Sequence, residues 1–270
     1  MGIFYFRGNF AVPVALTIAG SDSGAGAGIQ ADLKTFSALG VYGTTVITAI
    51  TAQNTVGVQA VEVVSAAMVR QQIEAVLSDI SVDAVKIGML GSLENVEVTA
   101  GLLRQYQARN IVLDPVLAST SGYRLLPGEA LNALVGQLLP VARMVTPNLA
   151  EAEILSGMKI STVNDMKTAA MAIHQIGPRM VLVKGGHLAG APIDVFYDGA
   201  DFVFLEAKRI PSENTHGTGC ALSSAIAAGL AKGLDPLNAV HAAKQFISAA
   251  IRHSLKIGSG KGPVNQFFNI

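Results

Sequence analysis

The sequence predicts an α/β fold, a doubly wound three-layer α/β/α sandwich around a mostly parallel sheet. Short apolar runs rich in Val and Ile alternate with longer segments of helical periodicity, which is typical of a parallel sheet buried on both faces. Apolar residues make up 50% of the 270 residues and charged residues only 14%, so the chain can bury a large core and is not disordered. No charge run, low-complexity linker or internal repeat divides it.

Eight short segments are expected to form strands. The first six are apolar and follow one another with helical segments between them, at residues 15–19, 44–51, 84–87, 111–113, 144–145 and 181–184. The last two, residues 193–197 and 202–205, are joined by Asp198-Gly199-Ala200-Asp201, which predicts an antiparallel hairpin turn. We therefore expect the parallel sheet to gain an antiparallel element late in the chain.

Eight helices are expected between and after these strands, over residues 29–39, 66–79, 93–108, 127–138, 149–156, 163–176, 221–232 and 236–253. Asn148 is a candidate N-cap for the fifth helix, with Glu151 three residues later as its capping-box partner. Pro236 stands in the first turn of the last helix, where proline is tolerated.

Charge and cysteine content exclude several classes of protein. Nineteen basic residues balance nineteen acidic ones, so no overall positive field attracts nucleic acid or an anionic membrane. A single cysteine excludes a disulfide framework and a structural zinc site, and it fits a reducing compartment. The first residues lack the features of a signal peptide, and the apolar run over residues 11–20 is too short to span a bilayer. We expect a cytoplasmic protein with no nucleic-acid or membrane partner.

Glycine and polar residues follow each of the first six predicted strands. In an open parallel sheet, ligands bind beyond the carboxyl ends of the strands, so these segments are expected to meet at one edge. The segments are residues 20–28, 53–54, 88–89, 114–116, 146–148 and 185–187. Their shared placement predicts a functional site more strongly than any one of them alone.

The glycine-rich segment 20–28 could bring the backbone close to a ligand and offer amides to an anion at the start of a helix. It does not match the dinucleotide motif GxGxxG, because Ile29 occupies the last glycine position. It does not match the phosphate-binding motif GxxxxGK[ST] either, because no lysine follows. The alternative is a flexible turn without a ligand.

The segment over residues 214–220 leads directly into an apolar helix rich in small residues. Gly217, Thr218 and Gly219 can present successive backbone N–H groups at the positive end of that helix, as a pocket for a phosphoryl group in transfer. The same field is expected to lower the thiol pKa of Cys220, and a thiolate there could accept a proton from a substrate hydroxyl. The alternative is that Cys220 is only a small buried residue.

Other candidates are open to two interpretations. Lys184 could reach nucleotide phosphates or could be a solvated strand end. Asn148 and Glu151 could act on Mg²⁺, directly or through water, or could only cap a helix. Asp114 could initiate a turn. Gln53 could hydrogen-bond the edge of a polar heterocycle or could simply end a strand.

Seven segments, in order, resemble the hydroxymethylpyrimidine and phosphomethylpyrimidine kinases of thiamin synthesis, which belong to the ribokinase-like superfamily. They are residues 19–34, 48–54, 86–89, 113–116, 146–151, 184–187 and 216–220. The resemblance runs from about residue 14 to the end, which predicts one ribokinase-like kinase domain over residues 14–270. Residues 1–13 are expected to be an N-terminal extension.

The resemblance implies two ATP-dependent steps that use Mg²⁺. The first phosphorylates the hydroxymethyl group of 4-amino-5-hydroxymethyl-2-methylpyrimidine, and the second converts that monophosphate to the diphosphate. Pyridoxine and pyridoxal kinases share the superfamily, and some similar proteins phosphorylate both heterocycles, so vitamin B6 salvage is the alternative. A binding protein without catalysis is disfavoured by the intact motifs at residues 146–151, 184–187 and 216–220. The resemblance also implies a homodimer.

The resemblance assigns roles to individual residues. It places the pyrimidine against Gln53, Asp32, Gly20, Met89 and the backbone of Val116. It implies that Cys220 is the catalytic base and that the anion hole is formed by Gly217, Thr218 and Gly219. It implies ATP contacts from Lys184, Asn148 and Thr146. It places the Mg²⁺ region at Asp114 and Glu151.

Overall fold

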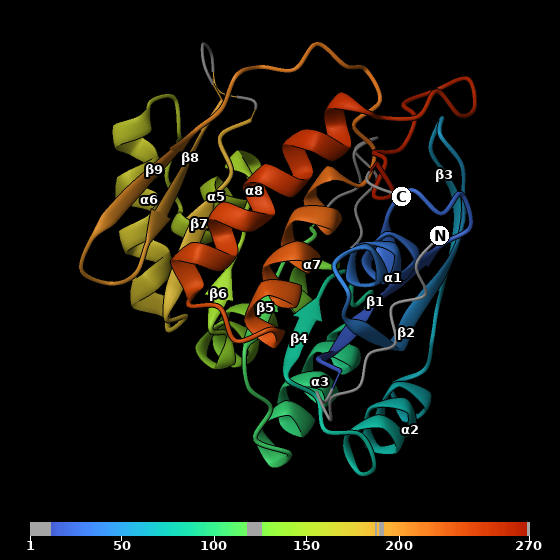
Figure 1. Cartoon of the computed structure of the whole chain (residues 1–270). Helices are drawn as coiled ribbons and strands as arrows, with labels where there is room; N and C mark the ends of the chain where they lie inside the picture. The colour runs from blue at the N-terminus through green and yellow to red at the C-terminus, as the bar shows by residue number, and fades with distance from the viewer. Residues whose placement is uncertain (1–11, 118–125, 187, 189–191, 269–270) are drawn as a thin grey trace.

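A nine-stranded sheet forms the centre of the computed structural model, which describes residues 12–117, 126–186, 188 and 192–268 (Figure 1). Its strand order is β3-β2-β1-β4-β5-β6-β7-β8-β9. The parallel strands are β1 (Val14–Asp22), β2 (Tyr42–Gln53), β4 (Ala84–Ile87), β5 (Ile111–Leu113), β6 (Met144–Val145) and β7 (Met180–Val183). The antiparallel pairings involve β3 (Val58–Val63), β8 (Ile193–Tyr197) and β9 (Phe202–Glu206). The predicted mostly parallel sheet and its late hairpin are confirmed.

β3 is a strand that the sequence pattern did not predict. It pairs antiparallel with β2 at one edge of the sheet, and most of its residues are exposed, so it carries no apolar run. The turn before it is built around Asn54, whose side-chain oxygen accepts hydrogen bonds from the amides of Val56 and Gly57, at 2.9 and 3.2 Å. This local turn reverses the chain, so that β3 can pair antiparallel with β2.

Helices cover both faces of the sheet. In Figure 1, one group lies in front of the strands, and it consists of α1 (Gly28–Ala38), α7 (Thr218–Ala231) and α8 (Pro236–Arg252). The opposite face carries α2 (Ala66–Leu77), α3 (Leu93–Gln105), α4 (Gly128–Ala133), α5 (Leu149–Ser156) and α6 (Val163–Ile176). The predicted helix over residues 127–138 is α4 continued by a π-helical stretch, η1 (Leu134–Leu138), and a short 3₁₀ turn, η2 (Leu139–Val141).

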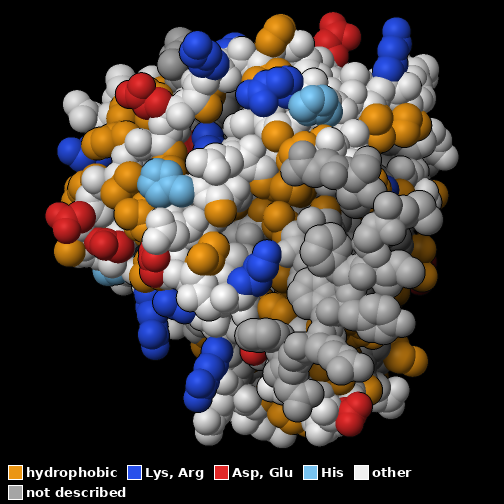
Figure 2. Space-filling view, in the orientation of Figure 1, with side chains coloured by type: hydrophobic (Ala, Val, Ile, Leu, Met, Phe, Trp, Pro, Cys, Tyr) orange, Lys and Arg blue, Asp and Glu red, His pale blue; other side chains and the backbone are white. Residues whose placement is uncertain are grey.

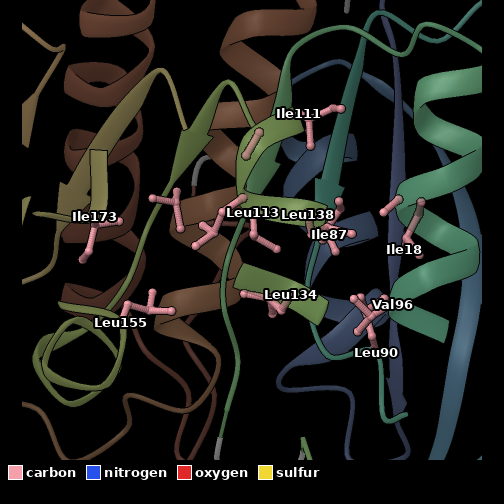
Figure 3. Close-up of a cluster of buried hydrophobic side chains, with 14 of the residues drawn as sticks. Ile18, Ile87, Leu90, Val96, Ile111, Leu113, Leu134, Leu138, Leu155 and Ile173 are labelled. Carbon is pink, nitrogen blue, oxygen red and sulfur yellow. The ribbon is translucent and has the colours of Figure 1, made fainter. Parts of the chain in front are cut away.

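Two apolar layers hold the sandwich together, one on each face of the sheet. Figure 3 shows the larger layer, in which strand side chains such as Ile87 and Leu113 lie among helical side chains such as Val96 and Leu138. The other layer is built largely from α7, whose ten residues from Ala221 to Leu230 are all buried and are mostly small. Small side chains let α7 lie close to the strands, and this brings its N-terminus to the edge where the strands end.

Charged side chains of both signs are interspersed over the face seen in Figure 2, in keeping with the balanced composition. Among the described residues, no helix combines the length and the apolar character needed to cross a membrane.

Candidate active site

The loop after β1 and the loop before α7 meet backbone to backbone at the carboxyl edge of the sheet. Gly217 has a φ of 79°, and a Cβ added to it would lie 1.8 Å from the carbonyl oxygen of Gly26. Gly28 has a φ of 58°, and its added Cβ would lie 2.3 Å from the carbonyl oxygen of Gly20. Only glycine satisfies both the left-handed backbone and the close approach at these positions. The N-termini of α1 and α7 are thereby brought together.

Asp22 organises the glycine-rich loop. Its carboxylate accepts hydrogen bonds from the amides of Gly24, Gly26 and Ala27, at 2.8, 3.1 and 2.8 Å, and lies 3.0 Å from Nε2 of His216. Burial, the largest influence, acts to raise the pKa of Asp22, but the hydrogen bonds from His216 and from the loop amides outweigh it and hold the pKa below its ordinary value. A charged Asp22 therefore ties the start of α1 to the segment before α7.

Three of the predicted heterocycle contacts lie toward the carboxyl ends of neighbouring strands, Gly20 on β1, Gln53 on β2 and Met89 after β4. The side-chain nitrogen of Gln53 is 3.2 Å from Nε2 of His216, and its side chain is partly exposed. A Cβ added to Gly20 would lie 3.2 Å from Sδ of Met89, so these two residues are neighbours. The hydroxyl of Thr48 donates to the carbonyl of Met89 over 2.6 Å and fixes the backbone there.

The N-terminus of α7 offers open hydrogen-bond donors. Within the described residues, no acceptor lies on the backbone N–H of Gly217, Gly219 or Cys220. The N–H of Thr218 differs, because it donates to the carbonyl of Thr215 over 3.3 Å. Free N–H groups at the positive end of a helix attract anions. Of the three predicted donors, Gly217 and Gly219 are open and Thr218 is engaged.

The half-buried thiol of Cys220 does not have the low pKa that its helix position predicted. Burial raises the pKa of Cys220 to about 11, although the positive charge of Lys86 and a hydrogen bond with the backbone of Gly28 act in the opposite direction. The negative charges of Asp32 and Asp114 add to the rise. The prediction of a lowered pKa was wrong because desolvation outweighs the field of the helix.

A second ion pair stands beside this helix start. Nζ of Lys184 lies 2.8 Å from Oδ1 of Asp114, and that carboxylate also accepts from the hydroxyls of Thr146 and Ser223, at 3.3 and 3.4 Å. Burial acts to lower the pKa of Lys184, but the charges of Asp114 and Glu151 outweigh it and raise the pKa. A Cβ added to Gly219 would lie 3.4 Å from Nζ of Lys184, so the ammonium lies next to the open amides.

Glu151 and Asn148 form the predicted capping box at the start of α5. The backbone N–H of Asn148 donates to Oε2 of Glu151 over 2.8 Å, and the backbone N–H of Glu151 donates to Oδ1 of Asn148 over 2.9 Å. Burial, assisted by the nearby charge of Asp114, raises the pKa of Glu151 to about 7. The carboxyl of Glu151 therefore caps α5 by accepting from the Asn148 backbone, and it also lies close to the charges of Lys184 and Asp114.

Comparison with known proteins identifies the family. The sequence profile described as phosphomethylpyrimidine kinase matches residues 22–265. The chain belongs to the phosphomethylpyrimidine kinase family. A hydroxymethylpyrimidine/phosphomethylpyrimidine kinase of Rhizobium meliloti is 56% identical over 94% of this chain and 97% of the relative. A bifunctional thiamine biosynthetic enzyme of Arabidopsis thaliana is 50% identical over 96% of this chain, which spans about half (51%) of that longer protein.

Solved structures of this family and of a related one share the fold. A phosphomethylpyrimidine kinase from Clostridium difficile 630 is 48% identical, with a TM-score of 0.79, and covers 88% of this chain and 99% of its own. An ADP complex of a pyridoxal kinase from Bacillus subtilis is 42% identical, with a TM-score of 0.89, and covers 95% of this chain and 98% of its own. The ribokinase-like fold predicted from the sequence is confirmed.

Of the remaining predicted features, Asp32 lies apart from the open rim, Val116 follows a strand of the sheet, and two others lie outside the described residues. Asp32 is fully buried, and both of its oxygens are hydrogen-bonded, so its side chain presents no surface to a ligand in this structure. Val116 follows β5, where its amide donates to the carbonyl of Asp114 over 2.8 Å. His187 of the motif after β7, and residues 1–11 of the expected extension, lie outside the described residues.

The structure adds residues to the site to which the sequence pattern gave no role. Asp22 fixes the glycine-rich loop, and Ser223 hydrogen-bonds Asp114. Lys86 is the clearest omission, because it is a fully buried cation within a strand whose other residues are apolar. A lysine in the middle of a buried strand is itself a signal, since buried charges are rare without a partner.

Proposed function

We propose that this chain is an ATP-dependent kinase of thiamin synthesis. It transfers a phosphoryl group to the hydroxymethyl oxygen of 4-amino-5-hydroxymethyl-2-methylpyrimidine, and then a second one to the resulting monophosphate. The observation that carries this proposal is the set of open amides at the start of α7, in the helical turn that carries Cys220 and beside the Lys184–Asp114 pair. Membership of the phosphomethylpyrimidine kinase family supplies the substrate class.

Phosphoryl transfer requires position and charge stabilisation more than covalent help from the protein. The substrate hydroxyl oxygen forms a bond to the γ-phosphorus of ATP while the bond to the bridging oxygen breaks, and ADP leaves with that electron pair. The amides of Gly219 and Cys220 and the ammonium of Lys184 face the charge that develops on the transferred group. Cys220, as thiolate, accepts the hydroxyl proton, a role usually worth about 10²–10⁴-fold in rate.

The heterocycle would bind at the ends of β1 and β2. The amide of Gln53 offers hydrogen bonds to a ring nitrogen or amino group, and the absence of a side chain at Gly20 leaves room beside Met89. The backbone of Val116, next to Asp114, would close the opposite side. The contact of Asp32 is proposed to be indirect, through the buried groups beneath the pocket.

The residues present fit a Mg²⁺ ion carried on ATP phosphates. Among the described residues, no group of three or more His, Cys, Asp or Glu side chains forms a metal cage. Mg²⁺ usually keeps several waters and binds one or two carboxylates together with substrate phosphates. Asp114 and Glu151 would hold it, and Asn148 and Thr146 would line the ATP phosphate region beside Lys184. When bound, the ion neutralises phosphate charge.

Pyridoxal phosphorylation is a second candidate function. The observation that favours it is the likeness to the pyridoxal kinase of Bacillus subtilis, whose TM-score of 0.89 exceeds the 0.79 of the phosphomethylpyrimidine kinase structure. Pyridoxal and the pyrimidine both present a hydroxymethyl group on a flat heterocycle, so one pocket could accept both.

ADP release with each acceptor decides between the two. Purified protein with Mg-ATP is expected to release ADP at least about tenfold faster, at limiting acceptor, with the hydroxymethylpyrimidine than with pyridoxal, a ratio that corresponds to about 1.4 kcal/mol of discrimination. The reverse ratio would move the assignment to vitamin B6 salvage. No ADP release with either acceptor would overturn both.

We further propose a cytoplasmic homodimer. The exposed side chains of Tyr42, Ile50 and Val56, on β2 and the turn after it, offer apolar surface for a second copy. Light scattering after size-exclusion chromatography tests this proposal, and a monomer mass at micromolar concentration would contradict it.

A further inference from the structure

A fully buried ion pair lies beneath the site. Nζ of Lys86 on β4 is 2.8 Å from Oδ2 of Asp32 on α1, and the two side chains are 1% and 0% exposed. Asp32 also accepts hydrogen bonds from the hydroxyls of Thr17 and Ser224, at 2.6 and 2.7 Å. Buried ion pairs add little stability over apolar residues of the same size, so stability alone does not account for this one.

The Lys86–Asp32 pair lies about one helical turn from Cys220, further along α1 and α7. The backbone of Gly28 hydrogen-bonds the thiol, and Asp32 stands four residues after Gly28 on α1. On α7, Ser224 stands four residues after Cys220 and reaches the same carboxylate. Residues four apart share one face of a helix, about 6 Å from each other. Both helices therefore direct the groups around Cys220 and the ion pair to one side.

Gly88 leaves room for the ammonium. A Cβ added to Gly88 would lie 2.8 Å from Nζ of Lys86 and 3.1 Å from the side chain of Ala19. The glycine after β4 thus lets the lysine head approach the backbone at the carboxyl end of the strand, on the side of the site. Asp32 then holds the head in place.

We propose that Lys86 is a positioning residue whose buried ammonium, held by Asp32, supplies the positive charge opposite the Cys220 thiolate. The link to catalysis rests on the proposed function, in which Cys220 accepts the proton of the substrate hydroxyl.

The charges around Cys220 support this role. Four charged groups act on the thiol, two of them positive and two negative: Lys86 from β4, Lys184 after β7, Asp32 from α1 and Asp114 after β5. Lys184 is paired with Asp114 and faces the phosphate region. Lys86 makes the largest contribution against the burial that raises the pKa of Cys220. Without it, the thiolate would face two carboxylates and a single cation, Lys184, which is already paired with Asp114.

The thiol itself gives the test, because Cys220 is the single cysteine of the chain. The rate of alkylation by iodoacetamide near neutral pH reports the thiolate fraction without substrate or ATP. Lys86→Met is expected to slow alkylation about three- to tenfold, because a lost opposite charge raises a pKa by about one unit or more and the more basic thiolate is somewhat more nucleophilic. A merely structural role would loosen the site, expose the thiol and speed the reaction.

Two further variants keep the test decisive. Lys86→Met with Asp32→Asn leaves no unpaired buried charge, so it is expected to fold even if the single variant fails to fold, and it is expected to slow alkylation by a smaller factor. Thr35→Val is the matched control, since Thr35 is equally buried on α1 but its hydroxyl, among the described residues, hydrogen-bonds only the carbonyl of Ala31. The alkylation rate of this variant should stay within about twofold of wild type. Unchanged or faster alkylation in the Lys86 variants would overturn the proposal.

Measurement of ADP release distinguishes the charge effect of Lys86 on the thiol from the role of Cys220 as the catalytic base. With the hydroxymethylpyrimidine as acceptor, the ascending limb of the pH profile of kcat/KM is expected to move to higher pH in the folded Lys86 variant. Slower alkylation with an unmoved pH profile would keep the charge effect on the thiol but would refute Cys220 as the base.

Discussion

Two opposing influences act on the thiol of Cys220 at the start of α7. The positive charge of Lys86 and the hydrogen bond with the backbone of Gly28 favour the thiolate, whereas burial and two carboxylates favour the thiol. Burial has the largest effect on the pKa of the thiol, and the opposing influences offset it only in part. The catalytic step therefore depends on how far the surrounding charges offset the burial of the thiol.

Replacing Cys220 by alanine separates the two phosphorylation steps. The first step is expected to fall about 10²–10⁴-fold, because the hydroxyl has lost its base. The second step is expected to fall less than about tenfold, because its acceptor is a phosphate oxygen that is already ionised near neutral pH. Rates measured separately from the pyrimidine and from its monophosphate check this asymmetry. Equal loss in both steps would show that Cys220 acts other than as a base.

Gly219→Ala tests the phosphoryl pocket. The new Cβ would lie 3.4 Å from Nζ of Lys184 and 3.6 Å from Oδ2 of Asp114, so the fold can accept it, but it narrows the space beside the open amides. We expect kcat/KM for ATP to fall about 10²-fold, as when an anion-hole donor is lost, with little change in thermal unfolding. Gly101→Ala, on an exposed part of α3 with open space around it, is the control and should leave activity unchanged. Equal activity in both variants would place the transfer elsewhere.

Glu151 gives a pH dependence of stability. Burial raises its pKa from 4.5 to about 7 in the folded chain, so between these values the folded state binds more protons than the unfolded state. The free energy of unfolding therefore loses this contribution as pH rises through the window. Glu151→Gln cannot ionise, and between about pH 5 and pH 8 its stability relative to wild type should rise by about 2–3 kcal/mol. Urea unfolding in metal-free buffer measures it, and a difference constant with pH would contradict the pKa.

At the scale of elements, the N-terminus of α7 depends on a backbone crossing between two loops. Gly217→Ala places a Cβ 1.8 Å from the carbonyl oxygen of Gly26 at a φ of 79°. Gly233 has a nearly equal φ of 83° but open space around it, so Gly233→Ala isolates the conformational cost, about 1 kcal/mol. We expect Gly217→Ala to lose at least about 2 kcal/mol more, from overpacking against the backbone. Chemical denaturation of both variants measures the difference, and equal losses would show that the crossing is not tight.

Elements with strong local signals were predictable. The capping box of Asn148 and Glu151 and the hairpin turn at Asp198-Gly199 depend on neighbouring residues, so the sequence pattern is sufficient for them. β3 has no apolar run and is a strand only because β2 offers it an edge. The π-helical stretch after α4 likewise has no signature in the apolar periodicity.

At the scale of the whole molecule, the order of apolar runs was enough to predict the sheet, and with it the edge at which the candidate site lies. The contacts within the site were not predictable, because they join distant parts of the chain. His216 and Asp22 are 194 residues apart, and Ser224 and Asp32 are 192 apart. The pKa of Cys220 was misjudged for the same reason: a helix start is visible in the sequence, whereas burial by α1 is not.

The most direct test of the proposed kinase activity is mass spectrometry of the products formed from the hydroxymethylpyrimidine and Mg-ATP over time. The monophosphate is expected to appear first and then to decline as the diphosphate accumulates, with ADP formed in each step. A phosphorylated product from pyridoxal and none from the pyrimidine would contradict the thiamin assignment. The absence of any phosphorylated product would contradict the phosphoryl-transfer site at the start of α7.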